Sequence, residues 1–363
     1  MPPSITSPDD PALALLCEKL HKLAGETDVT SRWPAEQLQL CGDHGVFEWF
    51  LEPEWGGQSW DQEAILRGYL ALSKACLTTT FIITQRSGAC RRIASGENDD
   101  LKSLLLPELA SGERFATVGI SHLTTSRRHL ATPVLQAERV EGGFVLDGFS
   151  PWVTGAAHAE HVVTGATLME NRNPTEQQLL VALPMDLPGA SAGDPAQLVG
   201  LSASHTGQVI CDNVFVEEQW LLAGPIENVM SLGSGAGTGG HQTSTLAVGL
   251  ARAAIDFIES ESARRAELGV PLDALRQDYD EVYASLLAVV RGEPSCSTET
   301  LRQRANSLVL RATQAALVTA KGAGYVQGHP VGRWCREALF FLVWSCPQPV
   351  VNANLCELAG IAE

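Results

Sequence analysis

The feature that most constrains this chain is a change in hydrophobic period, which occurs twice along the sequence. From about residue 11 to residue 110, apolar residues recur mostly at spacings of three and four, which is typical of amphipathic helices. Between 116 and 222 the pattern becomes short β-branched or apolar runs, such as 179–183, bounded by Gly, Pro and Asn. The helical period then returns. This order predicts an α+β protein in which a small sheet lies between two helical blocks.

We place the domain boundaries where the pattern changes. The prediction is an N-terminal helical domain at 1–115, a middle β domain at 116–222 and a C-terminal helical bundle domain at 223–363. Within the last domain we expect four helical segments, at 246–259, 275–290, 300–320 and 330–357. Four long helices with short or moderate connections are typical of a four-helix bundle.

Charge and cysteine usage narrow the classes of partner. Acidic residues outnumber basic ones by 42 to 25, giving a formal net charge of −17, which argues against nucleic acid or an anionic membrane surface as the main partner. No apolar run reaches the ~18 residues of a membrane span, and we see no secretory signal at the N-terminus. The nine cysteines show no CxxC pair, so we expect reduced thiols, no metal site and a cytoplasmic protein.

Five segments, in order, carry a resemblance to a known family. They are Leu51-Glu-Pro-Glu-Trp-Gly-Gly57, Leu106-Pro-Glu-Leu-Ala-Ser-Gly-Glu113, Leu146-Asp-Gly-Phe-Ser-Pro-Trp-Val-Thr-Gly155, Leu198-Val-Gly-Leu-Ser-Ala-Ser-His-Thr206, and Gly322-Ala-Gly-Tyr325 followed by Arg336-Glu-Ala338. Together they resemble the acyl-CoA dehydrogenase superfamily as a divergent member. The resemblance implies that family's fold: an N-terminal all-α domain, a middle β domain and a C-terminal four-helix bundle.

The resemblance also implies a cofactor, FAD, and the residues that would hold it. Trp152 would lie against the flavin ring, Thr154 would hydrogen-bond near its N5, and the backbone of Ser121 and His122 would serve its pyrimidine edge. An apolar planar neighbour and a tuning donor are what a flavin requires. Arg265 would reach a flavin diphosphate on a neighbouring subunit, which implies a homodimer or homotetramer; the alternative for Arg265 is an exposed helix-end arginine.

Two regions depart from the family's pattern. Where the family has a compact Gly-Ser pair beside the flavin and the acyl thioester, this chain has Arg127 and Arg128. Arg128 could bind a phosphate or carboxylate of the substrate, or the pair could form a solvated basic loop.

The second departure concerns the catalytic base. Ser345 stands where the family has its glutamate, and a serine without an activating partner cannot abstract a proton beside a thioester. The alternative position for the glutamate, on the first helix of the bundle, falls near Gly239. His241 close by could act as a base or be merely structural. The catalytic base is therefore not identified.

Three functions remain open. The first is an FAD-dependent oxidoreductase of the acyl-CoA dehydrogenase type, acting on the CH–CH group of an acyl-CoA with an undetermined electron acceptor. The second is a flavin monooxygenase or oxidase of the same fold, in which His122, His205 and His241 would take polar roles, whereas His329 precedes the expected position. The third is a non-catalytic paralogue acting as a binding or assembly module.

Overall fold

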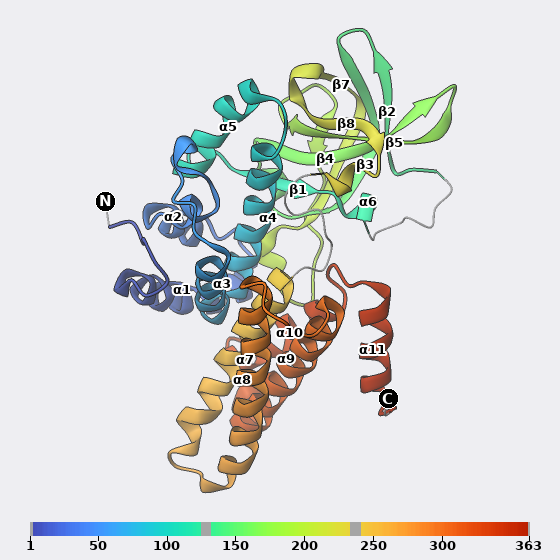
Figure 1. The fold of residues 1–363 in the computed structure, drawn as a ribbon. Helices are drawn as coiled ribbons and strands as arrows, with labels where there is room; N and C mark the ends of the chain where they lie inside the picture. The colour runs from blue at the N-terminus through green and yellow to red at the C-terminus, as the bar shows by residue number, and fades with distance from the viewer. Residues whose placement is uncertain (1–2, 125–131, 233–240, 362–363) are drawn as a thin grey trace.

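The computed structural model describes residues 3–124, 132–232 and 241–361. Helices of the first block lie beside a mixed sheet, and the helices of the last block extend from below both (Figure 1). The α+β fold with a central sheet between two helical blocks is therefore confirmed. The division into three independent domains stays a prediction.

The first block is built from amphipathic helices with clear ends. Its helices are α1 (Pro11–Thr30), α2 (Ala35–Asp43), α3 (Gln62–Ala75), α4 (Leu77–Ala94) and α5 (Asp99–Ser111). Asp10 caps α1 by accepting a hydrogen bond from the backbone N–H of Ala12, and Pro11 occupies the first helical position, where no N–H is needed. Of these helices, α4 packs directly on the sheet.

The sheet contains eight strands among the described residues. They are β1 (Ala116–Gly119), β2 (Leu135–Val140), β3 (Gly143–Val153), β4 (His161–Glu170), β5 (Asn173–Pro184), β6 (Ala190–Ala192), β7 (Gly207–Glu217) and β8 (Leu221–Glu227). Their order is β6-β7-β3-β2-β4-β5-β8, and β1 pairs in parallel with β4. A short helix, α6 (Ser121–Thr124), follows β1. The predicted boundary at 222 falls inside β8, because that strand continues its pairing with β5 up to Glu227.

The last block contains α7 (His241–Ser262), α8 (Gly269–Val290), α9 (Thr298–Ala320), α10 (Pro330–Ala338) and α11 (Gln348–Leu358). The single helix predicted at 330–357 is wrong, because the chain leaves the α-helix after Ala338, forms a 3-10 turn at Leu339–Leu342 and resumes only at Gln348. Ser345 has a φ of 47°, outside the helical region, and Pro347 has no N–H to offer to a continuing helix.

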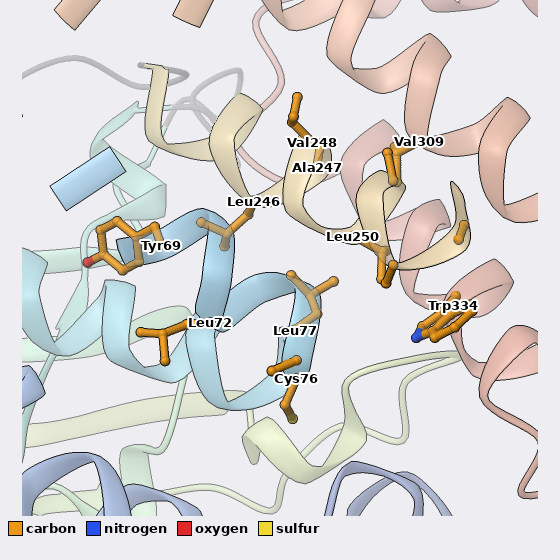
Figure 2. Packing of buried hydrophobic residues seen from close by; sticks show 14 of the residues in the cluster. Tyr69, Leu72, Cys76, Leu77, Leu246, Ala247, Val248, Leu250, Val309 and Trp334 are labelled. Atoms are coloured by element: carbon orange, nitrogen blue, oxygen red, sulfur yellow. The ribbon is translucent and has the colours of Figure 1, made fainter. Parts of the chain in front are cut away.

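The two helical blocks share one hydrophobic core, although they are far apart in sequence. Figure 2 shows Tyr69, Leu72 and Leu77 of the first block packed beside Leu246 and Leu250 of α7. Gly249 permits the close approach, since a Cβ there would lie 2.8 Å from the carbonyl oxygen of Leu70. Ser73 also donates a hydrogen bond to the carbonyl oxygen of Leu246 at 2.7 Å, which joins α3 to α7 directly.

None of the helices in the described part of the chain is both long enough and apolar enough to cross a lipid bilayer.

Candidate functional site

The expected flavin-ring residues, Ser121, His122, Trp152 and Thr154, lie on α6 and at the end of β3. β1 packs against α4 and leads into α6, whereas the first turn of α7 approaches the last turns of α4. Figure 1 shows α6 beside the sheet, where it packs against β3. Arg127, Arg128 and Gly239, which we singled out in the sequence, lie outside the described residues.

Trp152 occupies an irregular point on β3. The pairing of β3 with β7 shifts register between Ser150 and Val153, so that Trp152 lies in a bulge with a φ of 58°. Ser150 and Val153 on either side are fully buried, whereas 55% of the Trp152 side chain is exposed. A bulge that redirects one side chain away from the sheet is common beside active sites. Trp152 is therefore largely exposed at the surface of the sheet.

Thr154, two residues further, is buried in a chain of hydroxyl groups. Its Oγ1 lies 3.0 Å from Oγ1 of Thr206, which lies 2.8 Å from Oγ of Ser204. Three hydroxyls carry three protons, and the two hydrogen bonds between them use two. When Ser204 donates to Thr206 and Thr206 donates to Thr154, the proton of Thr154 is left to donate to a ligand.

The side chains of Ser121 and His122 on α6 point in different directions. Oγ of Ser121 donates to the carbonyl oxygen of Pro151 at 3.0 Å, which places Ser121 directly beside Trp152. Nε2 of His122 donates to the carbonyl oxygen of Gly165 at 2.7 Å, so its imidazole is directed into the sheet. Burial lowers the pKa of His122, while the Gly165 carbonyl partly opposes this. Its Nδ1 is buried and has no hydrogen-bond partner among the described residues.

Within one chain, Arg265 does not lie near Ser121, Trp152 and Thr154. It follows α7, whereas His241 begins it, and a helix of that length measures about 30 Å. Its Nη1 donates to the carbonyl oxygen of Thr319 at 2.7 Å, and its Nε donates to Glu267 at 3.1 Å. The guanidinium is thus engaged inside its own chain.

His241 stands at the first residue of α7, half-buried. Burial lowers the pKa of its imidazole, and the positive charge of Arg91 lowers it further. The imidazole is therefore neutral near pH 7. Its neighbour Gln242 accepts a hydrogen bond from Nη2 of Arg91 at 3.3 Å, which joins α7 to α4.

Ser345 lies in the segment between α10 and α11, and side chains of α9 hold this segment. Nη2 of the fully buried Arg302 donates to the carbonyl oxygens of Phe341 at 3.3 Å and Trp344 at 3.0 Å. Nδ2 of Asn306 donates to the Phe341 carbonyl at 3.0 Å. The position of Ser345 therefore depends on two polar side chains that come from another helix.

Glu337 and Arg302 are buried charges that the sequence reasoning missed. Only 2% of Glu337 is exposed, and burial raises the pKa of its carboxyl to about 7, although Arg333 at 3.6 Å opposes this. The signal in the sequence is a charged residue on the apolar side of a helical pattern, which is visible only once the helix's buried face is known.

A second missed feature is a pair of histidines beside the hydroxyl chain. Nε2 of His205 donates to the carbonyl oxygen of Ser31 at 3.0 Å, so its Nδ1 accepts from Nε2 of His158 at 2.9 Å. The ring of Trp33 stacks on His158 with centroids 4.2 Å apart. His205, expected to take a polar role, thus joins the first block to the loop before β7 that carries Thr206.

Comparison with known proteins gives consistent matches along the chain. Residues 10–113 match the family described as acyl-CoA dehydrogenase, N-terminal domain. A probable acyl-CoA dehydrogenase, YngJ of Bacillus subtilis, is 22% identical over 334 residues, covering 87% of this chain and 87% of the relative. The structure of glutaryl-coenzyme A dehydrogenase in complex with glutaryl-CoA superposes with a TM-score of 0.75 at 19% identity, covering 97% and 96% of the two chains.

A solved structure with a different ligand has the same fold. KijD3, in complex with FMN and dTDP-3-amino-2,3,6-trideoxy-4-keto-3-methyl-D-glucose, superposes with a TM-score of 0.75 at 19% identity, covering 99% of this chain and 98% of the other. The fold is therefore shared by proteins whose bound ligands differ in chemistry.

Proposed function

Because the chain is a member of the acyl-CoA dehydrogenase superfamily, we propose that it is a flavin-dependent oxidoreductase that acts on the CH–CH group of an acyl-CoA. The observation that carries the proposal is the geometry at the end of β3. An outward-facing Trp152 lies in a bulge beside Ser121, and a buried hydroxyl chain ends at Thr154. These are the two elements that a flavin ring needs from its protein, a planar apolar cover and an aligned donor.

FAD fits these residues at the ring end. Trp152 would cover one edge of the ring system and exclude water from it, and Thr154 would donate a hydrogen bond supplied through Thr206. When bound, FAD supplies an acceptor for a hydride from the β-carbon of the acyl group. At the diphosphate end the proposal relies on Arg265 of another subunit, which would have to exchange Glu267 and Thr319 for phosphate oxygens.

The proton acceptor stays open between two residues. Ser345 stands at the expected position, but its hydroxyl is a poor base without an activating partner. His241 is neutral near pH 7, which is the form that a base requires, although the lowered pKa makes it a weaker one. A substitution separates the cases: Ser345→Glu should speed any reduction of the flavin by acyl-CoA if the acyl group lies where the resemblance implies. An unchanged rate would place the acyl group elsewhere.

An absorption spectrum of the purified protein tests the proposal. We expect yellow protein, or uptake of added FAD, followed by bleaching when acyl-CoAs are added without oxygen. Protein that neither contains nor takes up flavin would contradict both enzymatic functions and leave a non-catalytic binding or assembly module.

A second candidate is a flavin monooxygenase or oxidase. The observation in its favour is the serine at position 345, because oxygen activation does not need a carboxylate there. In this case the flavin would keep its colour with acyl-CoA, and oxygen uptake would depend on an added reductant or on NAD(P)H.

Two further proposals concern assembly and location. We propose a homodimer or homotetramer, since Arg265 can reach a flavin only on a neighbouring subunit, and sedimentation velocity would test this. We also propose a cytoplasmic protein, since all nine cysteines are free thiols. A fluorescent fusion would test the location.

A further inference from the structure

A cavity of about 890 Å³ lies between the first and the last helical blocks. It is enclosed by the chain before α1, one face of α1, the end of α3, the second half of α7 and the start of α10. None of the described residues that line it belongs to the expected flavin site. The cavity is therefore a separate feature, and its volume is typical of pockets that hold drug-sized molecules.

The wall of the cavity combines small side chains with aromatic ones. Ala14, Ala75 and Ala253 come from three different helices and leave room that larger side chains would fill. Phe257 and Trp334 also line the cavity, with their ring centroids 6.3 Å apart in an edge-to-face arrangement. Narrow gaps beside alanine and the faces and edges of aromatic rings suit a flat, apolar ring system.

Several charged side chains around the cavity are paired within the protein. Asp256 of α7 forms ion pairs with Lys74 of α3 and with Arg252. Asp9, before α1, pairs with Arg67. An ionic ligand would have to displace one of these partners or stay uncompensated against an apolar wall.

The other charges at the cavity are also balanced. The carboxylate of Asp10 caps α1 by accepting a hydrogen bond from the backbone N–H of Ala12. Glu18 and Lys22 are exposed, carry opposite charges and stand four residues apart on α1, where such side chains are neighbours. The lining therefore complements an uncharged molecule.

Two neutral polar groups, Cys17 and His21, complete the lining on α1. Burial raises the pKa of the Cys17 thiol to about 12, so the thiol keeps its proton. Burial lowers the pKa of the His21 imidazole, the charges of Arg333 and Lys74 lower it further, and the backbone of Ala75 opposes this by accepting a hydrogen bond from the ring. A neutral imidazole has one N–H and one lone-pair nitrogen. Because the N–H serves Ala75, the second nitrogen of His21 is left to accept a hydrogen bond.

From these observations we infer that the cavity binds an uncharged aromatic molecule of several rings, which donates one hydrogen bond to His21. The rings would lie beside the alanines and against Phe257 and Trp334. An O–H or N–H on the ring edge would reach the lone pair of the imidazole. The site does not depend on the proposed function, because it shares no residue with the flavin group.

Fluorescence titration of the purified protein with two dyes tests the charge of the ligand. Phenylnaphthylamine is uncharged and has one N–H, whereas anilinonaphthalene sulfonate has the same rings and N–H and adds a sulfonate. We expect the uncharged dye to bind about tenfold or more tightly than the sulfonate. Equal or tighter binding of the sulfonate, or no rise in fluorescence with the uncharged dye, would overturn the inference.

Displacement of the bound dye tests the hydrogen bond to His21. Naphthol carries an O–H, whereas methoxynaphthalene has the same rings and no donor. Naphthol should displace the dye at a concentration lower by about threefold to tenfold, and His21→Phe should remove this difference, because phenylalanine keeps a ring but has no acceptor. Equal displacement by the two compounds, or a difference that survives His21→Phe, would overturn the role of His21.

A matched pair of substitutions tests the location. Ala14 lines the cavity from an exposed position on α1, so Ala14→Phe should fill part of the cavity without loss of stability and weaken dye binding by about tenfold. Ala284 is exposed on α8 and does not line the cavity, so Ala284→Phe should leave binding unchanged. The dye should raise the melting temperature of the parent and of Ala284→Phe more than that of Ala14→Phe. Equal dye affinity in the two variants would overturn the assignment to this cavity.

Discussion

The two sides of the candidate site are held in place by different kinds of interaction. On the sheet side, the strand pairing of β3 with β7 sets the position of Trp152, and neutral hydroxyls link Thr154 to Thr206 and Ser204. On the helical side, the segment with Ser345 is held by a buried arginine and an asparagine from another helix. Backbone pairing survives most side-chain changes, whereas a segment held by side chains does not. We therefore expect substitutions to have larger effects on the helical side.

The largest effect should come from Arg302→Ala. The substitution leaves a cavity and removes the donor to the carbonyl oxygens of Phe341 and Trp344. The free energy of unfolding should therefore fall by about 4 kcal/mol. Urea denaturation would measure it. Arg304 lies two residues away on the same helix and forms a surface ion pair. Arg304→Ala should therefore lower the free energy of unfolding by less than about 1 kcal/mol. Similar losses in the two variants would contradict a special role for the buried arginine.

The next effect is the pH dependence contributed by Glu337. Its pKa is about 7 in the folded protein, above its ordinary value of 4.5, so the folded state holds the proton over a range in which the unfolded state has released it. Stability from this group is therefore present below about pH 4.5 and is lost as pH rises to about 7, by on the order of 3 kcal/mol. Glu337→Gln should remove this contribution. Parallel stability profiles for parent and variant between pH 4.5 and 7.5 would count against the raised pKa.

On the sheet side, Thr206→Val should have a smaller effect. It removes the central hydroxyl of the chain and leaves those of Thr154 and Ser204 without their partner, at a cost of about 1 to 2 kcal/mol. Thr117→Val is the matched control, because the Thr117 hydroxyl is fully buried on β1 and has no partner among the described residues. Thermal unfolding should show a loss for the first variant and no loss for the second. The reverse order would argue against the hydroxyl chain.

The smallest effect on stability should come from Trp152→Ala, within about 0.5 kcal/mol, because the side chain is mostly exposed. Its effect should appear instead in FAD binding, measured by fluorescence titration, as a loss of about tenfold. Phe215→Ala removes another exposed aromatic side chain, on β7, and should leave FAD binding unchanged. A large loss of stability with unchanged FAD binding would mean that Trp152 has a structural role only.

The difference between local interactions and contacts from distant elements also decides what could be predicted from the sequence. The block order and most helices and strands follow from local periodicity, and Trp152 could be found because its motif is local. The break after Ala338 was missed because apolar residues continue through it, and the side chains that hold the broken segment, Arg302 and Asn306, lie on α9 far away in sequence. The contact between Arg91 and Gln242 was missed for a similar reason. The two residues are 151 positions apart, and only the packing of α7 on α4 brings them together.

The core shared by the first and last helical blocks has a consequence for biosynthesis. A ribosome releases α1 and α3 long before α7, yet part of the apolar surface of these helices is covered by residues made later, such as Leu246, Leu250 and Trp334. The nascent chain must therefore carry uncovered leucines through the synthesis of the entire sheet, a situation in which chains tend to aggregate or to need a chaperone. A truncated chain that stops after β8 would leave that part of the apolar surface uncovered.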